Sequence, residues 1–184
     1  MGAGLSKNRI KGLSASVDQN SAVLILGTLP GRMSLTYGKY YADPSNKFWD
    51  ILFIACGEKI DKTDQGKKQL LEKYHIALWD ILYSAVRKTS NDKDISDETP
   101  NNLPLFLSQY PNIKLLIFHS NYAYKYFKRF FNNTAVPYIC VSSPSGQNRK
   151  GTQEKAKEWR AALSCAIPQL RNGPRLAWKG ALPC

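Results

Sequence analysis

Apolar and polar positions alternate along this chain in blocks, and their spacing changes from that of strands to that of helices. Apolar runs at 23–26 and 136–141, and a third at 113–118 that only Lys114 interrupts, predict strands covered on both faces. A compact apolar segment at 76–82 precedes a polar stretch at 88–102, which we expect to be a loop. Helices are predicted at 48–56, 67–73, 103–109, 121–131 and about 153–167, the last one capped by Thr152. Strands that alternate with helices predict an α/β fold with a mostly parallel sheet covered on both faces.

Length and hydropathy indicate how the chain is organised. Its 184 residues, 43% of them hydrophobic, suit one domain with a substantial core. We expect a flexible N-terminus over 1–10, a single domain over 11–170 and a tail over 171–184. No apolar stretch approaches the roughly 20 residues of a membrane span, and basic residues interrupt the start where a signal peptide would be apolar. The expectation is an intracellular protein, cytoplasmic, in the nucleoid or nuclear, that is not secreted and binds no membrane.

Charge indicates the class of partner. Lys and Arg number 26 against 14 Asp and Glu, which gives a formal net charge of +12. Such a surplus on a small domain favours a polyanion, most simply nucleic acid, although a basic enzyme without such a partner has the same composition. The four cysteines form no Cys-x-x-Cys pair and there are only two histidines, so we expect no zinc site.

Two unusual loops follow predicted strands: the first loop at 27–47 and the second loop at 142–150. Because the carboxyl ends of parallel strands meet at one edge of a sheet, both loops should line one cleft. The first loop supplies aromatic rings, on which nucleic-acid bases can stack. The second loop supplies small residues together with Arg149 and Lys150, which suit a phosphate backbone.

Some residues around the first loop also have purely structural explanations. Helical spacing points Phe48 and Trp49 inward, as expected of core residues, and Asn46 is placed to cap the helix that they begin. Tyr41 differs from them because it lies in a loop between Gly38 and Pro44. It is therefore the aromatic residue best placed to meet a ligand.

The residues of both loops form a spaced set of motifs. The first loop contains Gly27-Thr28-Leu29-Pro30-Gly31, then Tyr40-Tyr41-Ala42, then Pro44-Ser45-Asn46-Lys47-Phe48-Trp49. These stretches resemble the first motif of the uracil-DNA glycosylase superfamily, closest to its DNA-deoxyinosine (hypoxanthine-DNA) glycosylase group. Supporting stretches follow at 77–82, 90–95 and 100–102. Ser143-Pro144-Ser145-Gly146 with Arg149 resembles the second motif in its mismatch-specific uracil-DNA glycosylase form, and the resemblance covers roughly residues 11–168.

The resemblance implies a monomeric, three-layer α/β/α enzyme with a short, mostly parallel central sheet and no metal or cofactor. Such an enzyme flips a deaminated base, hypoxanthine or uracil, out of duplex or single-stranded DNA and hydrolyses the bond between base and sugar. The implied base-binding residues are Gly27, Thr28, Leu29, Gly31 and Tyr41, with Tyr41 as the stacking aromatic. The implied DNA-binding residues are Ser143, Pro144, Ser145, Gly146, Gln147, Arg149 and Lys150, with Gly146 and Gln147 in the loop that fills the gap left by the flipped nucleotide.

Departures from the family pattern leave alternatives open. The resemblance assigns catalysis to Asn46, which would orient a water molecule, since an amide removes no proton at neutral pH. Asp43 stands where relatives often carry His or another polar residue, and it is either a general base or only a cap. His119 replaces an Asn and either hydrogen-bonds the base or has no role. Leu29 occupies the position of the water-orienting Asn of the mismatch-specific branch, and Gln147 is polar where an apolar wedge is common.

Three functions are consistent with these features. The first is a DNA glycosylase for hypoxanthine or uracil. The second is a catalytically weak DNA-binding module of the same fold, which Leu29 favours. The third is a nucleotide or nucleoside hydrolase that uses the same cleft. Base release separates the first from the second, and competition between free nucleotide and duplex DNA separates the third.

Overall fold

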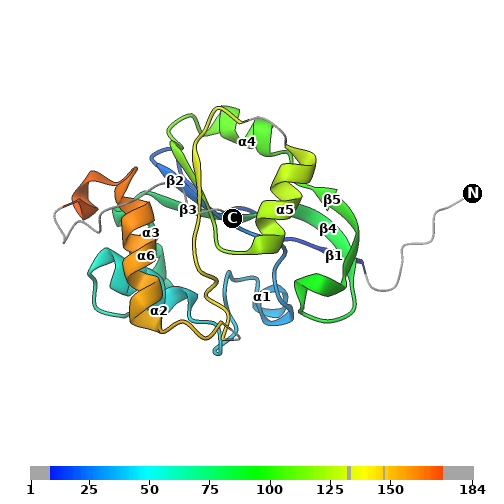
Figure 1. The fold of residues 1–184 in the computed structure, drawn as a ribbon, viewed down its shortest axis with the longest axis horizontal. Coiled ribbons are helices and arrows are strands. Elements are labelled where there is room, and N and C mark those ends of the chain that lie inside the picture. Colours follow the sequence, from blue (N-terminus) through cyan, green and yellow to red (C-terminus); the bar gives the residue numbers. More distant parts are fainter. Residues whose placement is uncertain (1–8, 132–133, 147, 172–184) are drawn as a thin grey trace, which may run out of the picture.

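A sheet of four parallel strands lies at the centre of the molecule, in the order β3-β2-β6-β7 (Figure 1). The computed structural model describes residues 9–131, 134–146 and 148–171. The four strands are β2 (Val23–Gly27), β3 (Ile76–Asp80), β6 (Leu115–Phe118) and β7 (Tyr138–Cys140). The predicted parallel sheet is confirmed, although β6 and β7 are shorter than the apolar runs that predicted them.

Helices cover both faces of this sheet, which confirms the three-layer α/β/α fold. Successive side chains of a strand point to opposite faces, so Val23 and Ile25 lie in one core and Leu24 and Leu26 in the other. The first core lies beneath α2 (Phe48–Cys56), α3 (Asp64–Lys73) and α6 (Thr152–Ser164). The second core lies beneath α4 (Leu103–Gln109) and α5 (Asn121–Phe130).

A second sheet, antiparallel and in the order β1-β4-β5, was not anticipated. Its strands are β1 (Arg9–Lys11), β4 (Leu82–Arg87) and β5 (Ile95–Pro100), and the short 3-10 helix η1 (Asp92–Asp94) precedes β5. The prediction of a loop over 88–102 was therefore wrong in part. The reason is that β5 is an edge strand with mostly exposed side chains, so it lacks the apolar pattern of a buried strand.

Other differences are local. The first loop contains a short helix, α1 (Arg32–Tyr37), and Arg9 and Ile10 of the expected N-terminal segment belong to β1. Gly151 rather than Thr152 is the N-cap of α6, which ends at Ser164 and is followed by the 3-10 helix η2 (Pro168–Leu170).

No helix within the described ranges is long and apolar enough to cross a membrane. The predicted tail falls outside the described residues from position 172 onward.

Candidate active site

Three residues, Asp80, Gly27 and His119, lie in a row across the carboxyl edge of the parallel sheet. Gly27 pairs in register with Asp80, and Leu26 pairs with Phe118, so His119 follows at the level of Gly27. A Cβ atom on Gly27 would lie 2.4 Å from Asp80 Oδ1 and 3.5 Å from His119 Nε2. Only glycine therefore lets the Asp80 carboxyl approach the end of β2 this closely, whereas the distance to His119 is an ordinary contact.

Tyr41 brings an aromatic ring to this row. Its hydroxyl shares a hydrogen bond of 2.5 Å with His119 Nε2. Its backbone adopts a left-handed conformation with φ 52°, and its ring stacks on Phe48 with 3.5 Å between ring centroids and 5° between planes. Phe48 is fully buried, as predicted for a core residue, and it backs one face of the Tyr41 ring. No second ring among the described residues stacks on Tyr41; His119 meets it edge-on at 5.4 Å and Tyr40 lies tilted at 6.0 Å.

The electrostatics of the row result from burial. Burial raises the pKa of the Asp80 carboxyl to about 7, with Asp92 adding to the rise and Arg87 opposing it. Burial lowers the pKa of the His119 imidazole to about 4, so this ring is neutral at neutral pH. Within the described ranges, Asp80 Oδ2 and His119 Nδ1 are buried without a hydrogen-bond partner. Buried polar atoms are normally paired, so these two atoms mark the row as a candidate for a functional role.

Asn46 and Asp43 lie in the turn before α2 and differ in environment. Asn46 Oδ1 accepts a hydrogen bond of 2.9 Å from the Phe48 N–H, so its side chain does support the start of the helix. Its Nδ2 donates to no atom of the described chain. Asp43 is exposed, and its Oδ1 accepts from the Ser45 hydroxyl and N–H at 2.7 and 2.9 Å. These bonds lower the pKa of the Asp43 carboxyl, which makes it a weaker base.

The two loops lie side by side, as the parallel sheet predicted. The Lys47 N–H donates to the Pro144 carbonyl at 3.0 Å, and a Cβ on Gly146 would lie 3.3 Å from the Ser45 carbonyl oxygen. Thus the second loop rests against the turn that carries Asn46.

The cations of the second loop differ in availability. Arg149 is exposed and forms no ion pair with any described residue. Lys150 Nζ, in contrast, lies 2.7 Å from Glu158 Oε2 and donates to the Ser142 hydroxyl at 3.2 Å. The Ser143 hydroxyl accepts from the Ser145 N–H at 3.2 Å, and Gln147 lies outside the described residues. Arg149 is therefore the cation of this loop that is ready to meet an anion.

The remaining base-binding candidates lie on the Thr28-Leu29-Pro30-Gly31 segment, which leaves β2. Thr28 Oγ1 is 3.0 Å from Ser120 Oγ, and Gly31 is the N-cap of α1. The Leu29 side chain is buried in the second core, so it presents no group to water.

Several polar residues beside the site were not predicted: Asp80, Arg87, Asp92 and Ser120. The available signal was a polar residue at the end of an apolar strand, as in Asp80 after 76–79. Among the described residues, no group of three or more His, Cys, Asp or Glu side chains could hold a metal ion.

Fold and site together define an α/β protein whose ligand site lies at the carboxyl edge of a parallel sheet, between an aromatic loop and a basic loop. The sequence pattern of the uracil DNA glycosylase superfamily matches residues 15–164, and the chain belongs to this family. It is therefore a DNA glycosylase, an enzyme class that hydrolyses N-glycosidic bonds, and DNA is its partner.

Individual relatives agree with this assignment. The chain is 31% identical to the hypoxanthine DNA glycosylase of Methanosarcina acetivorans and 29% identical to that of Methanosarcina barkeri, in each case over 83% of this chain and 97% of the relative. It also resembles a solution NMR structure of a candidate uracil DNA glycosylase from Methanosarcina acetivorans. That match has a TM-score of 0.75 at 29% identity and covers 86% of this chain and 98% of the other.

Proposed function

We propose that this chain excises a deaminated base, hypoxanthine or uracil, from DNA as the first step of base-excision repair. The observation that carries the proposal is the set of buried polar groups around Gly27: the Asp80 carboxyl, the His119 imidazole and the Tyr41 hydroxyl. A base placed there meets both hydrogen-bond donors and acceptors. The similarity to hypoxanthine DNA glycosylases makes hypoxanthine the first substrate to test.

Binding begins with extrusion of the nucleotide, because a base inside the duplex is out of reach of any enzyme group. The face of Tyr41 opposite Phe48 stacks on the extruded base, and Phe48 supports the ring from behind. The backbone N–H groups of Thr28, Leu29 and Gly31 supply donors to the edge of the base, since their carbonyls already accept from Leu82, Arg87 and Leu35. His119 contacts the base in its neutral form, which matches the lowered pKa of its imidazole.

Hydrolysis then needs a water molecule in line with the bond that breaks. Water adds to the sugar carbon while the base leaves with the electron pair of the N-glycosidic bond, so positive charge develops on the sugar. The departing base leaves as an anion and takes up the proton that the water loses. We assign the water to Asn46, because its Oδ1 is fixed by the Phe48 N–H while Nδ2 stays available. Asp43 is the weaker candidate, since hydrogen bonds from Ser45 hold the pKa of its carboxyl below the ordinary value.

DNA phosphates on either side of the site are bound by the second loop. Ser143, Ser145 and Gly146 offer hydroxyl and backbone donors, and exposed Arg149 offers a charge-assisted contact. Pro144 is buried and shapes the loop. Lys150 reaches a phosphate only by leaving Glu158, and Gln147 remains the proposed wedge. The enzyme would act as a monomer on damaged duplex or single-stranded DNA, in the compartment that holds the genome.

A cleavage assay tests the proposal. Labelled duplexes that contain one hypoxanthine, one uracil or no lesion are incubated with the protein and then treated with alkali, which breaks the strand wherever a base has been released. We expect breaks at hypoxanthine, at uracil or at both, and none in the unmodified duplex. Tight, salt-sensitive binding without breaks would contradict the proposal and would favour the DNA-binding module, for which the buried Leu29 side chain is the supporting observation.

A further inference from the structure

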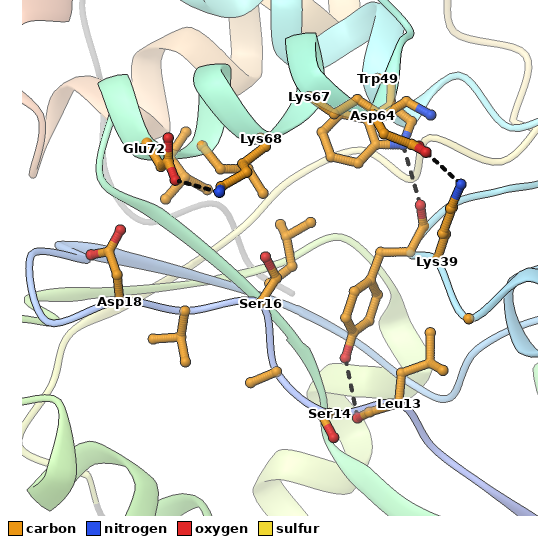
Figure 2. Close-up of a pocket in the computed structure, with 17 residues that line it drawn as sticks. Leu13, Ser14, Ser16, Asp18, Lys39, Trp49, Asp64, Lys67, Lys68 and Glu72 are labelled. Atoms are coloured by element: carbon orange, nitrogen blue, oxygen red, sulfur yellow. Dashed lines mark hydrogen bonds and ion pairs between the residues drawn. The ribbon is translucent and has the colours of Figure 1, made fainter.

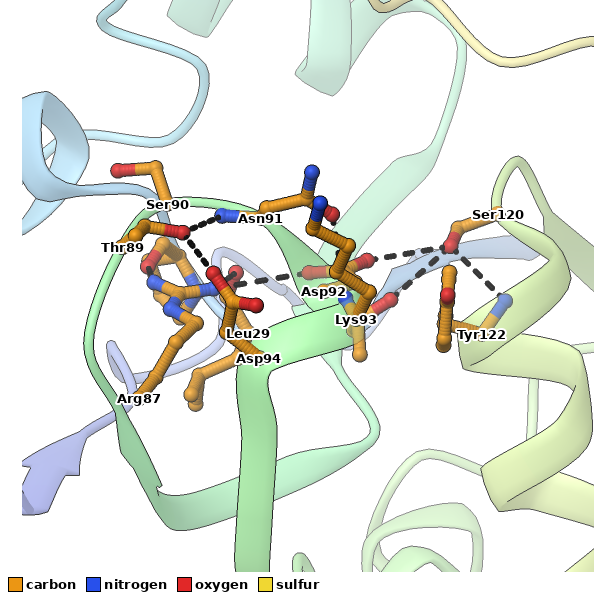
Figure 3. A network of polar contacts seen from close by, with 12 residues as sticks. Leu29, Arg87, Thr89, Ser90, Asn91, Asp92, Lys93, Asp94, Ser120 and Tyr122 are labelled. Carbon is orange, nitrogen blue, oxygen red and sulfur yellow. Dashed lines mark hydrogen bonds and ion pairs between the residues drawn. The ribbon is translucent and has the colours of Figure 1, made fainter.

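A buried guanidinium group lies beneath the segment that leaves β2 (Figure 3). Arg87 is the last residue of β4, and its side chain is only 2% exposed. Its Nη1 donates to the Leu29 carbonyl at 3.2 Å, and its Nη2 donates to the Pro30 carbonyl. One side chain thus holds two successive carbonyl groups of the first loop.

The guanidinium group is itself held by a chain of polar contacts that returns to β2. Asp92 Oδ1 lies 3.6 Å from Arg87 Nη1, and Asp92 Oδ2 accepts from the Ser120 hydroxyl at 3.3 Å. Ser120 Oγ caps α5 and lies 3.0 Å from Thr28 Oγ1. The ends of β2, β4 and β6 are therefore linked through one network around this segment.

These contacts determine which way the backbone of the segment faces. In a trans peptide unit the C=O and the N–H point in opposite directions, and no described peptide bond is cis. With the Pro30 carbonyl turned toward Arg87, the Gly31 N–H points away from the guanidinium group. Pro30 has no N–H, so Gly31 carries the donor that this arrangement exposes. The Gly31 N–H donates to no other described backbone group.

We propose that Arg87 is a positioning residue for base excision: by holding the Leu29 and Pro30 carbonyls, it fixes the Gly31 N–H as a hydrogen-bond donor to the departing base. The inference rests on the proposed function above and adds a residue that touches neither base nor water. A donor that is oriented before the reaction stabilises the charge developing on the leaving base without further reorganisation. Asp92 keeps the guanidinium group in place and compensates its buried charge.

The main test is Arg87→Lys, which retains the positive charge but replaces the planar fork with a single ammonium group. A donor misplaced by an ångström can lower a rate about 100-fold, and we expect a loss of this order in the single-turnover rate on hypoxanthine or uracil duplexes. The dissociation constant for the same DNA should change by less than about threefold, because the phosphate contacts lie on the second loop. Arg160→Lys is the matched control, since Arg160 Nη1 donates to the Ala55 carbonyl at 2.9 Å, between α6 and α2.

A rescue experiment separates positioning from a general loss of structure. Guanidinium ion at millimolar concentration should restore much of the single-turnover rate of Arg87→Ala, whereas ammonium or potassium at equal ionic strength should not. If Arg87→Ala does not fold, Asp92→Asn replaces it, because it loosens the guanidinium group without removing it; a rate loss of about tenfold is expected with unchanged DNA affinity.

The outcomes distinguish the two proposals. A wild-type protein that releases neither base overturns the proposed function. An active wild type whose Arg87→Lys variant keeps its single-turnover rate overturns the role of Arg87. Parallel losses of rate, DNA affinity and melting temperature without guanidinium rescue would also overturn it, since they indicate a purely structural arginine.

Discussion

Both loops at the carboxyl edge rest on a buried cation, but the two cations are held differently. Arg87 donates from two nitrogens to the first loop and has Asp92 as a partner at 3.6 Å. Lys155 of α6 is also buried, and its Nζ donates to the carbonyls of Asn148 at 3.2 Å and Ser145 at 3.5 Å in the second loop. Among the residues that the structure describes, no carboxylate forms an ion pair with Lys155.

The neighbours of Lys155 explain the difference. Lys150 takes the nearby carboxylates, with Glu158 at 2.7 Å and Glu154 at 3.8 Å. Burial, with a contribution from Lys150, therefore lowers the pKa of the Lys155 ammonium. An arginine keeps its charge at any accessible pH and fixes two peptide planes, whereas an ammonium is a single point of attachment. We infer that the first loop is held rigidly for chemistry and the second more adaptably for contact with DNA.

The largest effect that this comparison predicts is on the rate, through the first loop. Asn46→Ala should lower the single-turnover rate about 1,000-fold, as expected for a lost catalytic hydrogen-bonding group, while the affinity for DNA stays near the wild-type value. Single-turnover cleavage and a binding titration measure the two quantities. Asp43→Asn is the control and should keep most of the rate; if it loses as much as Asn46→Ala, the water belongs to Asp43.

A second prediction concerns stability beneath the first loop. The pKa of Asp80 is raised to about 7 in the folded protein, so between about pH 4 and 7 folding takes up a proton and stability falls as the pH rises. Asp80→Asn removes this loss. The unfolding free energy of the variant relative to wild type should therefore be about 2 kcal/mol higher at pH 8 than at pH 5, and melting temperatures at the two pH values measure this difference. His119 titrates in the opposite sense in both proteins, because its lowered pKa favours folding as the pH rises from 4 toward 6.5. An equal difference at both pH values would show that Asp80 is ionised when folded.

A third and smaller effect should appear on affinity, through the anchor of the second loop. Lys155→Met keeps the aliphatic packing but leaves the Ser145 and Asn148 carbonyls without their donor, and such a loss costs about 1–3 kcal/mol. DNA affinity should fall about tenfold with an unchanged single-turnover rate at saturating enzyme, as measured by titration and cleavage. Lys157→Met is the control because Lys157 is exposed on the same helix. A rate that falls with the affinity would show that the loops do not divide the two tasks.

The smallest effect should come from one phosphate contact. Arg149→Ala should weaken binding equally for all sequences and reduce the slope of log affinity against log salt by about one. Lys128→Ala, an exposed change on α5, should leave this slope unaltered. Binding measured at several salt concentrations with lesion-containing and unmodified duplexes provides the test. A loss confined to one lesion or one opposing base would mean that Arg149 reads the site rather than the phosphates.

A large groove borders the first loop at Gly38, Lys39 and Tyr40. It lies between the 13–18 segment and α3, has a volume of about 630 Å³ and is lined partly by Tyr40 and Trp49 (Figure 2). The Tyr40 hydroxyl lies 3.4 Å from the Leu13 carbonyl, and the Tyr40 carbonyl accepts from the Trp49 indole N–H at 3.3 Å. Ion pairs such as Lys39–Asp64 and Lys68–Glu72 neutralise much of the charge on its walls. Among the described residues, Lys67 is the one cation of the lining without an ion pair, and its ammonium lies over the Trp49 ring at 5.3 Å. A single such cation does not make a site for a polyanion.

Residue patterns predicted the parallel strands and most helices because those features are local. The run at 23–26 favoured a buried strand, and the mostly apolar segment 48–56 matched α2 at both ends. The edge strand β5 was missed because its side chains are mostly exposed, and α1 was missed because it has only six residues. The strand β5 forms because it pairs with β4, and its own composition gives no sign of this pairing.

The sequence by itself determined the family, the parallel sheet and the meeting of two loops at one edge, because motif spacing and strand order are carried along the chain. Only the tertiary structure decided which polar residues surround Gly27, since strand register sets Asp80 and His119 beside it. It likewise decided that Lys150 is paired while Arg149 is not, and that Arg87 lies beneath Leu29, 58 positions away. Those outcomes depend on burial and contact between distant segments, which no local pattern records.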